Sequence, residues 1–94
     1  MRITWTQEAL FDLENILAYY YLQAGAVIAE SVESRIIEQI EALLNFPEKT
    51  RVSDRIPGAR EAAIQRLPYI AFIRISADTV QVLNIVHTAR KFPA

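Results

Sequence analysis

The spacing of apolar residues changes once along this chain, near Pro47, and that change constrains the fold more than any other feature. Before Pro47, apolar residues recur every three or four positions, as one face of an amphipathic helix requires. After residue 59, short apolar runs bounded by turn residues are typical of β-strands. A chain of 94 residues has room for one core, so we expect a single domain over residues 1–94.

The first half reads as a short strand followed by two helices. Residues 3–5 favour a strand with a distant partner, and Thr6 is a suitable N-cap for the helix that follows. Gly25 breaks the first apolar stripe, and the second helix runs from about Ala26 until Pro47 stops it. The stripes comprise Leu10, Leu13, Ile16, Leu17 and Tyr20, then Ala29, Val32, Ile36, Ile40, Leu43 and Leu44. The short connection predicts an antiparallel helical hairpin.

The second half predicts an irregular loop over residues 47–59 and then three strands, over 60–67, 69–75 and 80–87. In the last strand we expect Val80, Val82 and Val86 to alternate with Leu83, Ile85 and His87 on the opposite face. The order β-α-α-β-β-β therefore predicts an α+β fold, an antiparallel sheet packed against the N-terminal helical hairpin.

Several classes of site are excluded by residue content. The chain has no cysteine, one histidine and two glycines, so thiolate chemistry, paired-histidine metal sites and glycine-rich phosphate loops are absent. We therefore expect no cofactor and no metal. The N-terminus lacks a signal-peptide pattern, and no apolar run reaches membrane-spanning length, so we expect a cytoplasmic protein without a membrane partner.

The net charge of −1 conceals two halves of opposite sign. Residues 1–46 hold two basic and seven acidic residues, a net of −5, whereas residues 47–94 hold eight basic and four acidic residues, a net of +4. Two solvated faces would explain this, but so would a basic surface for an anionic partner. The candidate surface comprises Arg51, Arg55, Arg60, Arg66, Arg74, His87, Arg90 and Lys91.

A metal-free nuclease would need cations for the phosphate and a group that moves protons near neutral pH. His87, Arg60 and Arg66 are the candidates for those roles. Structural interpretations compete with these roles. His87 could be a hydrogen-bonded histidine at a strand end, and Arg60 could form an ion pair with Glu61. Arg74, from the candidate surface, could be partly buried and paired. Carboxylates on the helices are better explained as a solvated face than as a catalytic pair.

Five stretches occur in a characteristic order and spacing: Trp5 with the acidic helix at residues 9–16, the second helix end at 40–47, the loop at 51–61, and the strand pieces at 67–72 and 86–93. In these stretches, and so over nearly its full length, the sequence resembles the ParE branch of the RelE/ParE toxin superfamily, which includes plasmid stabilisation proteins. No tyrosine follows Tyr69, where RelE-type nucleases often carry a tyrosine or histidine near the C-terminus.

The resemblance implies the toxin of a type II toxin–antitoxin module, silenced in a hetero-oligomer by a small acidic, ParD-like antitoxin. It implies DNA gyrase as the target, bound without chemistry. The alternatives are a RelE-type, metal-independent endoribonuclease that cuts mRNA on the ribosome, and a non-toxic relative that only binds its antitoxin. An apolar content of 52%, above the usual share, is consistent with apolar surface kept for such a partner.

Overall fold

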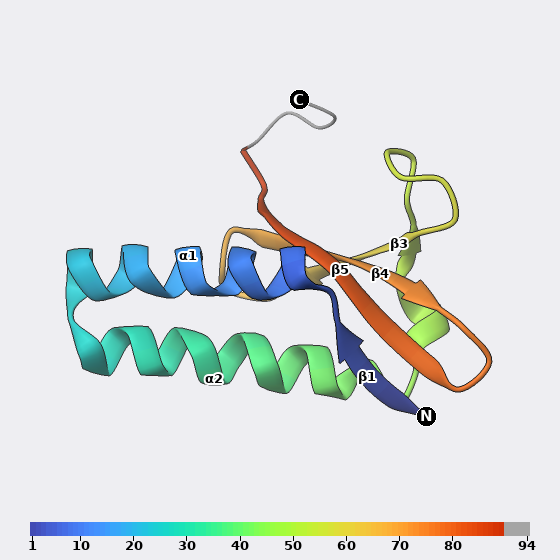
Figure 1. The fold of residues 1–94 in the computed structure, drawn as a ribbon, viewed down its shortest axis with the longest axis horizontal. Coiled ribbons are helices and arrows are strands. Elements are labelled where there is room, and N and C mark those ends of the chain that lie inside the picture. The colour runs from blue at the N-terminus through green and yellow to red at the C-terminus, as the bar shows by residue number, and fades with distance from the viewer. Residues whose placement is uncertain (90–94) are drawn as a thin grey trace.

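The computed structural model describes residues 1–89, the side chain of Lys49 excepted, so the predicted basic residues Arg90 and Lys91 lie outside the described residues. The elements are β1 (Arg2–Trp5), α1 (Gln7–Ala24), α2 (Ala26–Ala42), the 3₁₀ helix η1 (Pro47–Lys49), β2 (Arg51–Val52), β3 (Arg60–Ile64), β4 (Tyr69–Ile75) and β5 (Thr79–His87). Their order confirms the predicted succession of strand, two helices and strands (Figure 1).

The helical hairpin forms where the sequence predicts it, but α2 ends at Ala42 and does not continue to Pro47 as predicted. The Thr6 hydroxyl accepts a hydrogen bond from the Ala9 N–H at 3.0 Å, which caps the first turn of α1. Gly25 alone connects the helices, with φ at +90°, in the left-handed region that favours glycine. Its N–H donates to the Tyr21 carbonyl at 2.9 Å, so the same residue closes α1 and opens α2.

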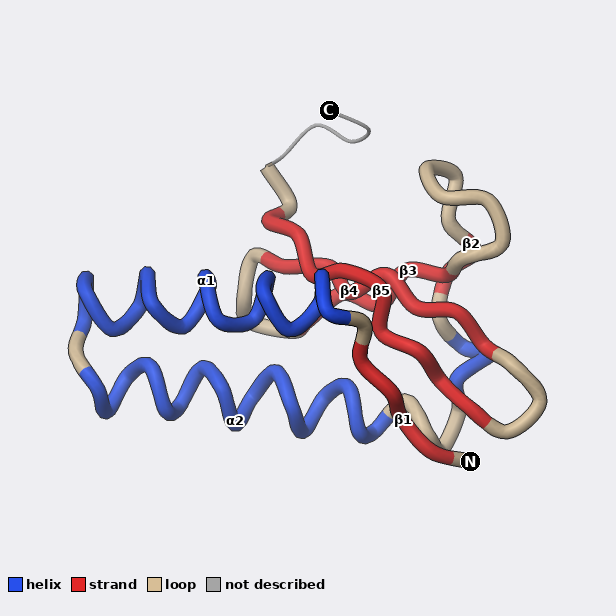
Figure 2. Tube along the Cα trace, viewed as in Figure 1, coloured by secondary structure: helices blue, strands red, loops and turns tan. Residues whose placement is uncertain are grey.

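The five strands form one mixed sheet in the order β1-β5-β4-β3-β2. Strands β3 to β5 are antiparallel, as predicted; β2 also pairs antiparallel with β3, and β1 adds to β5 in parallel, with Ile3 opposite Val80. The short N-terminal strand therefore does pair with a distant segment. The α+β fold class is confirmed, and β1 lies at one edge of the sheet, next to the strand that ends the described chain (Figure 2).

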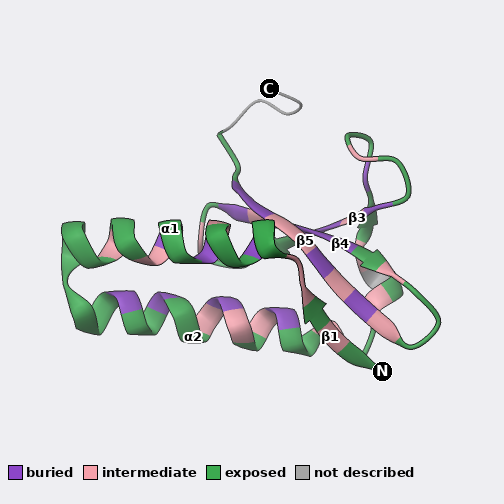
Figure 3. Ribbon diagram, viewed as in Figure 1, coloured by how far each residue is buried: buried purple, intermediate pink, exposed green. Residues whose placement is uncertain are grey.

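The main core lies between the hairpin and one face of the sheet. Its fully buried side chains include Ile36 and Ile40 from α2, and Ile73, Val80 and Val82 from the central strands. Burial runs along the sheet and along the facing sides of the helices, whereas the far end of the hairpin is exposed (Figure 3). The hairpin projects beyond the sheet, which covers only the half of it that carries the N-terminus of α1 (Figure 1).

A β-bulge in β5 overturns the predicted alternation of that strand. Phe72 is opposite Asn84 but its neighbour Ile73 is opposite Val82, which leaves Leu83 without a partner. An extra residue shifts the side-chain phase by one. Ile85 therefore joins Val80 and Val82 in the main core, although the simple alternation placed it on the opposite face.

The loop predicted over residues 47–59 contains two short regular pieces, η1 and β2, so the expectation of no regular structure there is wrong. The strand predicted over 60–67 ends at Ile64, and a turn follows. Within that turn Arg66 adopts φ of +68°, a conformation that a strand does not allow. Arg66 therefore lies in a turn, beyond the end of β3.

The opposite face of the sheet also carries buried residues. Phe72 is fully buried, and because neighbours on a strand point to opposite faces, it points away from the main core that holds Ala71 and Ile73. Ser53 and Ala59, at the two ends of the β2–β3 loop, are also buried. This loop stands above the sheet on the side away from α2 (Figure 1).

Candidate target-binding surface

One hydroxyl fixes the loop over residues 53–59 to the sheet. The Ser53 Oγ donates to Glu61 Oε2 at 2.8 Å and accepts the backbone N–H groups of Arg55 and Ile56, each at 3.1 Å. The Ser53 N–H also donates to the Ala59 carbonyl at 2.9 Å, which closes the loop at its base. The loop that presents Arg55 is thus held by a buried serine and a buried carboxylate on β3.

Arg60 is occupied inside the protein. Its Nε donates to Thr50 Oγ1 at 2.9 Å, and its Nη2 donates to the carbonyl oxygens of Glu48 at 2.9 Å and of Thr50 at 2.5 Å. The expected ion pair between Arg60 and Glu61 is wrong, because the Glu61 carboxylate binds Ser53 instead. Arg60 therefore anchors the segment between α2 and β2, which uses three of the five N–H donors of its guanidinium.

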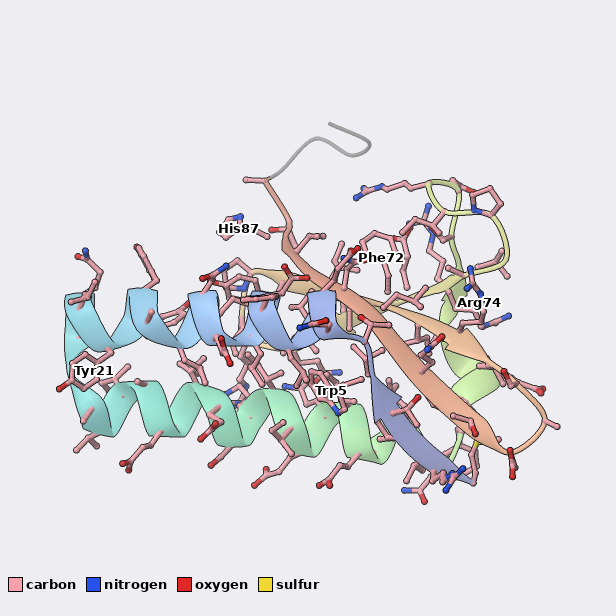
Figure 4. The ribbon with its side chains drawn as sticks, in the orientation of Figure 1. Trp5, Tyr21, Phe72, Arg74 and His87 are labelled. Atoms are coloured by element: carbon pink, nitrogen blue, oxygen red, sulfur yellow. The ribbon has the colours of Figure 1, made fainter. Side chains whose placement is uncertain are left out.

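Three other arginines remain at the surface on the same side of the molecule, and we call Arg51, Arg55 and Arg74 the loop-side basic surface. Arg51 forms an exposed ion pair with Asp54 at 3.1 Å, and Arg55 is exposed on the loop. Arg74 lies opposite Gln81 and is exposed, so the expectation that it is partly buried is wrong. Its neighbour Ile73 pairs with Arg60, the first residue after the loop, and Figure 4 shows Arg74 at this end of β4.

His87 and Arg66 lie at the other end of the sheet. His87 ends β5, opposite Tyr69, and its ring meets the Tyr69 ring edge-on with centroids 5.4 Å apart. Its Nδ1 accepts the Ala89 N–H at 3.0 Å. Arg66 is exposed in the turn that leads into β4. His87 therefore has the local hydrogen bond that a structural histidine would have, while its ring remains exposed (Figure 4).

The three candidate catalytic residues do not converge. Arg60 opens β3, opposite Ile73, whereas His87 is level with the residue pair Ile64 and Tyr69 at the far end of that strand. Four residue steps along a strand separate the two ends by about 13 Å. General acid–base catalysis requires its groups within hydrogen-bond reach of one substrate atom. This arrangement brings His87 and Arg66 to one end of the sheet and leaves Arg60 at the other.

Tyr69 is held in its neutral form. Burial, together with a hydrogen bond to the Tyr20 side chain, raises the pKa of Tyr69 from 10.0 to about 12. Tyr19 packs edge-on against Tyr20, with ring centroids 5.3 Å apart, which completes an aromatic cluster between α1 and β4. A phenol with this pKa does not accept a proton near pH 7. Among residues 1–89, no group of three or more histidine, aspartate or glutamate side chains could hold a metal ion.

Two carboxylates on α1 bind the bulge in β5, a role that the sequence did not indicate. Asp12 Oδ2 accepts the Ile85 N–H at 2.9 Å, and Glu8 Oε2 accepts a hydrogen bond from the Asn84 amide at 2.9 Å. The Thr6 hydroxyl, just before α1, donates to the carbonyl of the bulge residue Leu83 at 2.7 Å. The interpretation of all helix carboxylates as a solvated face is therefore wrong for these two.

An apolar cavity of about 430 Å³ lies beside β3. It is lined by Leu43, Phe46, Thr50, Arg51, Glu61, Ala62, Ala63 and Ile70. Strand β2 pairs only with Arg60 and Glu61, so within the described residues the outer edge of β3 has no neighbouring strand from Ala62 to Ile64. Unpaired backbone groups at a sheet edge are a template for an added strand. Cavity and open edge thus lie together at the β2 side of the sheet.

Comparisons with known proteins agree with this geometry. Residues 3–92 match the family model described as the ParE toxin of type II toxin-antitoxin system, parDE. A protein of Sinorhizobium fredii strain NGR234, named "Putative toxin Y4kP", is 36% identical over 92 residues, which cover 98% of this chain and 93% of that protein. Within residues 1–89, neither helix is long and apolar enough to cross a membrane.

Solved structures give the same result at the level of the fold. A chain of the chromosomal ParDE toxin–antitoxin system from P. aeruginosa superposes with a TM-score of 0.84 at 29% identity, covering 93% of this chain and 95% of that one. A chain of the E. coli RelBE toxin–antitoxin complex superposes with a TM-score of 0.55 at 14% identity, covering 95% and 96%, and shows the shared fold alone. With a family model matched over almost its entire length, this chain belongs to the ParE toxin family of type II toxin–antitoxin systems.

Proposed function

We propose that this chain is the toxin of a type II toxin–antitoxin pair and that it inhibits DNA gyrase by binding it, without chemistry of its own. The observation that carries the proposal is the separation of the cationic groups. The loop-side basic surface is exposed on β2, on β4 and on the loop that Ser53 and Glu61 hold to the sheet, whereas the candidate catalytic residues are split between two ends of the sheet. Preorganised exposed arginines suit recognition of carboxylates or phosphates. Either gyrase or a ribosome as target would place the chain in the cytoplasm.

A supercoiling assay with purified gyrase tests this proposal. We expect the unaltered toxin to block supercoiling and the triple variant Arg51→Glu, Arg55→Glu, Arg74→Glu to lose at least about tenfold in potency, because each reversal repels an anionic partner group. Arg2→Glu is the matched control, since Arg2 is an exposed arginine on β1 at the opposite edge of the sheet. Unimpaired supercoiling at stoichiometric unaltered toxin would refute gyrase as the target.

The second candidate function is cleavage of mRNA on the ribosome. It is favoured by the exposed ring of His87, which ends β5 at the same end of the sheet as Arg66. Primer extension on translated mRNA would then show cleavage that His87→Ala abolishes and that Arg60→Lys retains. Growth arrest that persists in His87→Ala would exclude this role. Absence of any growth arrest on induction would instead indicate a relative that only binds its antitoxin.

The antitoxin, on this proposal, adds an extended segment to the open edge of β3 and places an apolar side chain in the adjoining cavity. Pairing with Ala62 to Ile64 supplies backbone hydrogen bonds, and Arg51 at the cavity rim suits a partner that is small and acidic. The hetero-oligomer would also cover Phe46, whose side chain is exposed and lines the cavity.

Two exposed phenylalanines provide a matched test of that docking mode. Phe46 lines the cavity beside β3, whereas Phe11 lies on α1. We expect Phe46→Ala to weaken binding of the antitoxin encoded beside the toxin gene by at least about tenfold in calorimetry, since loss of a buried aromatic contact commonly costs more than 1.4 kcal/mol. Phe11→Ala should leave the affinity unchanged. Equal effects of the two substitutions would contradict the proposed docking site.

A further inference from the structure

A small pocket lies on the helix side of the sheet, where α1 meets the start of β4 and the end of β5. It has a volume of about 260 Å³. Its wall includes Asp12, Asn15 and Tyr19 from α1, and Tyr69 and His87 from the strands. Pockets that take drug-sized ligands measure roughly 300–1,000 Å³, so this one suits a single side chain. Figure 4 shows His87 well separated from Arg74, and the pocket is therefore distinct from the loop-side basic surface.

The charge of this pocket is negative. Among the described residues that line it, Asp12 is the one with an acidic side chain, and none is a lysine or an arginine. His87 adds no positive charge, because its Nδ1 accepts the Ala89 N–H, which an imidazolium could not do. Helix α1 also carries the exposed Glu8 and Glu14 and has no lysine or arginine along its length. This charge favours a cationic occupant and repels a phosphate.

The Asp12 carboxylate is held by one oxygen and open at the other. Its Oδ2 accepts the Ile85 N–H at 2.9 Å, whereas its Oδ1 accepts no hydrogen bond from the part of the chain that the structure describes. The side chain is half-buried, so its position is fixed without full loss of access. A backbone N–H does not neutralise the carboxylate. The open oxygen can therefore accept a charge-assisted hydrogen bond, which is about twice as strong as one between neutral groups.

Aromatic rings complete the wall of the pocket. The rings of His87 and Tyr69 meet edge-on with centroids 5.4 Å apart, and Tyr19 meets Tyr20 edge-on at 5.3 Å. An edge-on contact covers one face of one ring, so ring faces remain for an occupant, and Tyr19 is 57% exposed. A cation within about 6 Å of a ring centroid is attracted to the ring face. Arginine suits this combination, because its planar guanidinium stacks on a ring while its N–H groups donate to a carboxylate.

We propose that this pocket binds an arginine side chain of a partner protein, which donates to Asp12 Oδ1 and packs against the ring of Tyr19. Single-stranded nucleic acid also stacks on aromatic rings, but its backbone requires a positively charged groove, and α1 is acidic. The pocket and the loop-side basic surface attract opposite charges at separate places. A partner that spans both is held in one orientation, because the reverse orientation brings like charges together. Recognition at this pocket is independent of gyrase as the target.

A nuclear magnetic resonance titration of the full-length protein with N-acetylarginine amide tests the proposal. We expect saturable shifts of the Ile85 amide and of the His87 ring, with a dissociation constant of about 1 mM for a ligand of this size. N-acetylcitrulline amide has nearly the same shape without the charge, and it should leave both signals in place. Equal shifts with the two amides, or no saturable shift with the arginine amide, would overturn the proposal.

Substitutions on α1 assign the binding to the carboxylate and to the ring. Asp12→Asn keeps an oxygen for the Ile85 N–H but removes the charge, and it should weaken binding of the arginine amide at least about tenfold. Tyr19→Leu should weaken it about threefold. Tyr21→Leu is the matched control, because Tyr21 is 59% exposed on the same helix but does not line the pocket.

Circular dichroism checks that each variant keeps its fold, and the tyrosine pair decides the question alone if Asp12→Asn does not fold. Unchanged affinity in Asp12→Asn, or an equal loss in Tyr19→Leu and Tyr21→Leu, would refute a cation site at this pocket.

Two other occupants would give different results. An arginine of the chain itself, either Arg66 in the turn before β4 or Arg90 three residues after His87, would compete with the added amide. The variant Arg66→Gln with Arg90→Gln would then bind the amide more tightly, whereas we expect its affinity to equal that of the unaltered chain. A short oligouridylate that shifts the same signals in a Tyr19-dependent way would assign the pocket to nucleic acid. Either result would overturn the proposal.

Discussion

The helical half of this molecule and its strand half use charged residues differently. In the helical half, residues 1–46, Asp12 accepts a hydrogen bond from the backbone of β5 and Glu8 accepts one from the Asn84 side chain. The other carboxylates of this half are exposed. In the strand half, Arg60 and Glu61 hold the connecting segments, while the loop-side arginines face solvent.

This difference separates charge that builds the fold from charge that is available to a partner. Each half combines both kinds, so the net charges of −5 and +4 do not identify a binding surface by themselves. The distinction depends on acceptors. Arg60 has three oxygen acceptors within its own chain, whereas Arg51 has one exposed aspartate and can exchange it for a partner's carboxylate at little cost.

The largest expected effect concerns Phe72, which lies in the strand half and faces away from the main core. Phe72→Ala should lower the free energy of unfolding by about 3–5 kcal/mol, because a fully buried aromatic side chain leaves a cavity. Phe11→Ala, on the exposed side of α1, should cost less than about 1 kcal/mol. Urea denaturation of both variants checks the contrast. If the two variants lost the same free energy of unfolding, the side chain of Phe72 would contribute no more to stability than an exposed phenylalanine.

The next effect concerns the serine that fixes the loop. Ser53→Ala removes one donor and one acceptor, leaving a buried Glu61 carboxylate and the N–H groups of Arg55 and Ile56 without their partner, so we expect a loss of about 2–3 kcal/mol. Hydrogen exchange should speed up at the Arg55 and Ile56 amides while the α1 amides stay protected. Uniform acceleration across both halves would contradict a local role for the loop.

A smaller, pH-dependent effect concerns Tyr69, where the two halves meet. Its folded pKa of about 12 lies above the unfolded value of 10.0, so its neutral form stabilises the fold at all pH values below 10. That stability, up to about 2 kcal/mol, should be lost as pH rises from about 10 to 12. Thermal denaturation across this range measures it. Tyr69→Phe should flatten the profile, and a profile unchanged in that variant would assign the pH dependence to other groups.

The smallest effect on stability should accompany the exposed ion pair. Arg51→Ala should change the free energy of unfolding by less than about 0.5 kcal/mol, because both side chains of the pair with Asp54 are solvent-exposed. Arg60→Ala, by contrast, removes three hydrogen bonds and should cost about 1–3 kcal/mol. Urea denaturation of the two variants compares them directly. Equal costs would erase the distinction between free and structural arginines in the strand half.

Much of the fold could be predicted from local pattern. The Thr6 cap, the break at Gly25 and the strand over residues 69–75 follow from hydrogen-bonding capacity, backbone freedom and apolar spacing, all of which act over a few residues. The family resemblance was confirmed by a match over residues 3–92. The candidate site was less predictable. All eight basic residues were candidates, but the sequence contains no signal that Arg60 would be tied to Thr50.

The sequence by itself determined the order of the elements, the helical hairpin and the opposite charges of the two halves, because periodicity and composition are local properties of the chain. Only the tertiary structure decided the parallel pairing of β1 with β5 and the bulge at Leu83, which places Ile85 in the core. It also decided that Arg60 is bound within the chain whereas Arg51, Arg55 and Arg74 are exposed. These depend on hydrogen-bond partners that are distant in sequence, such as Asp12 and Ile85, and no local pattern specifies such partners.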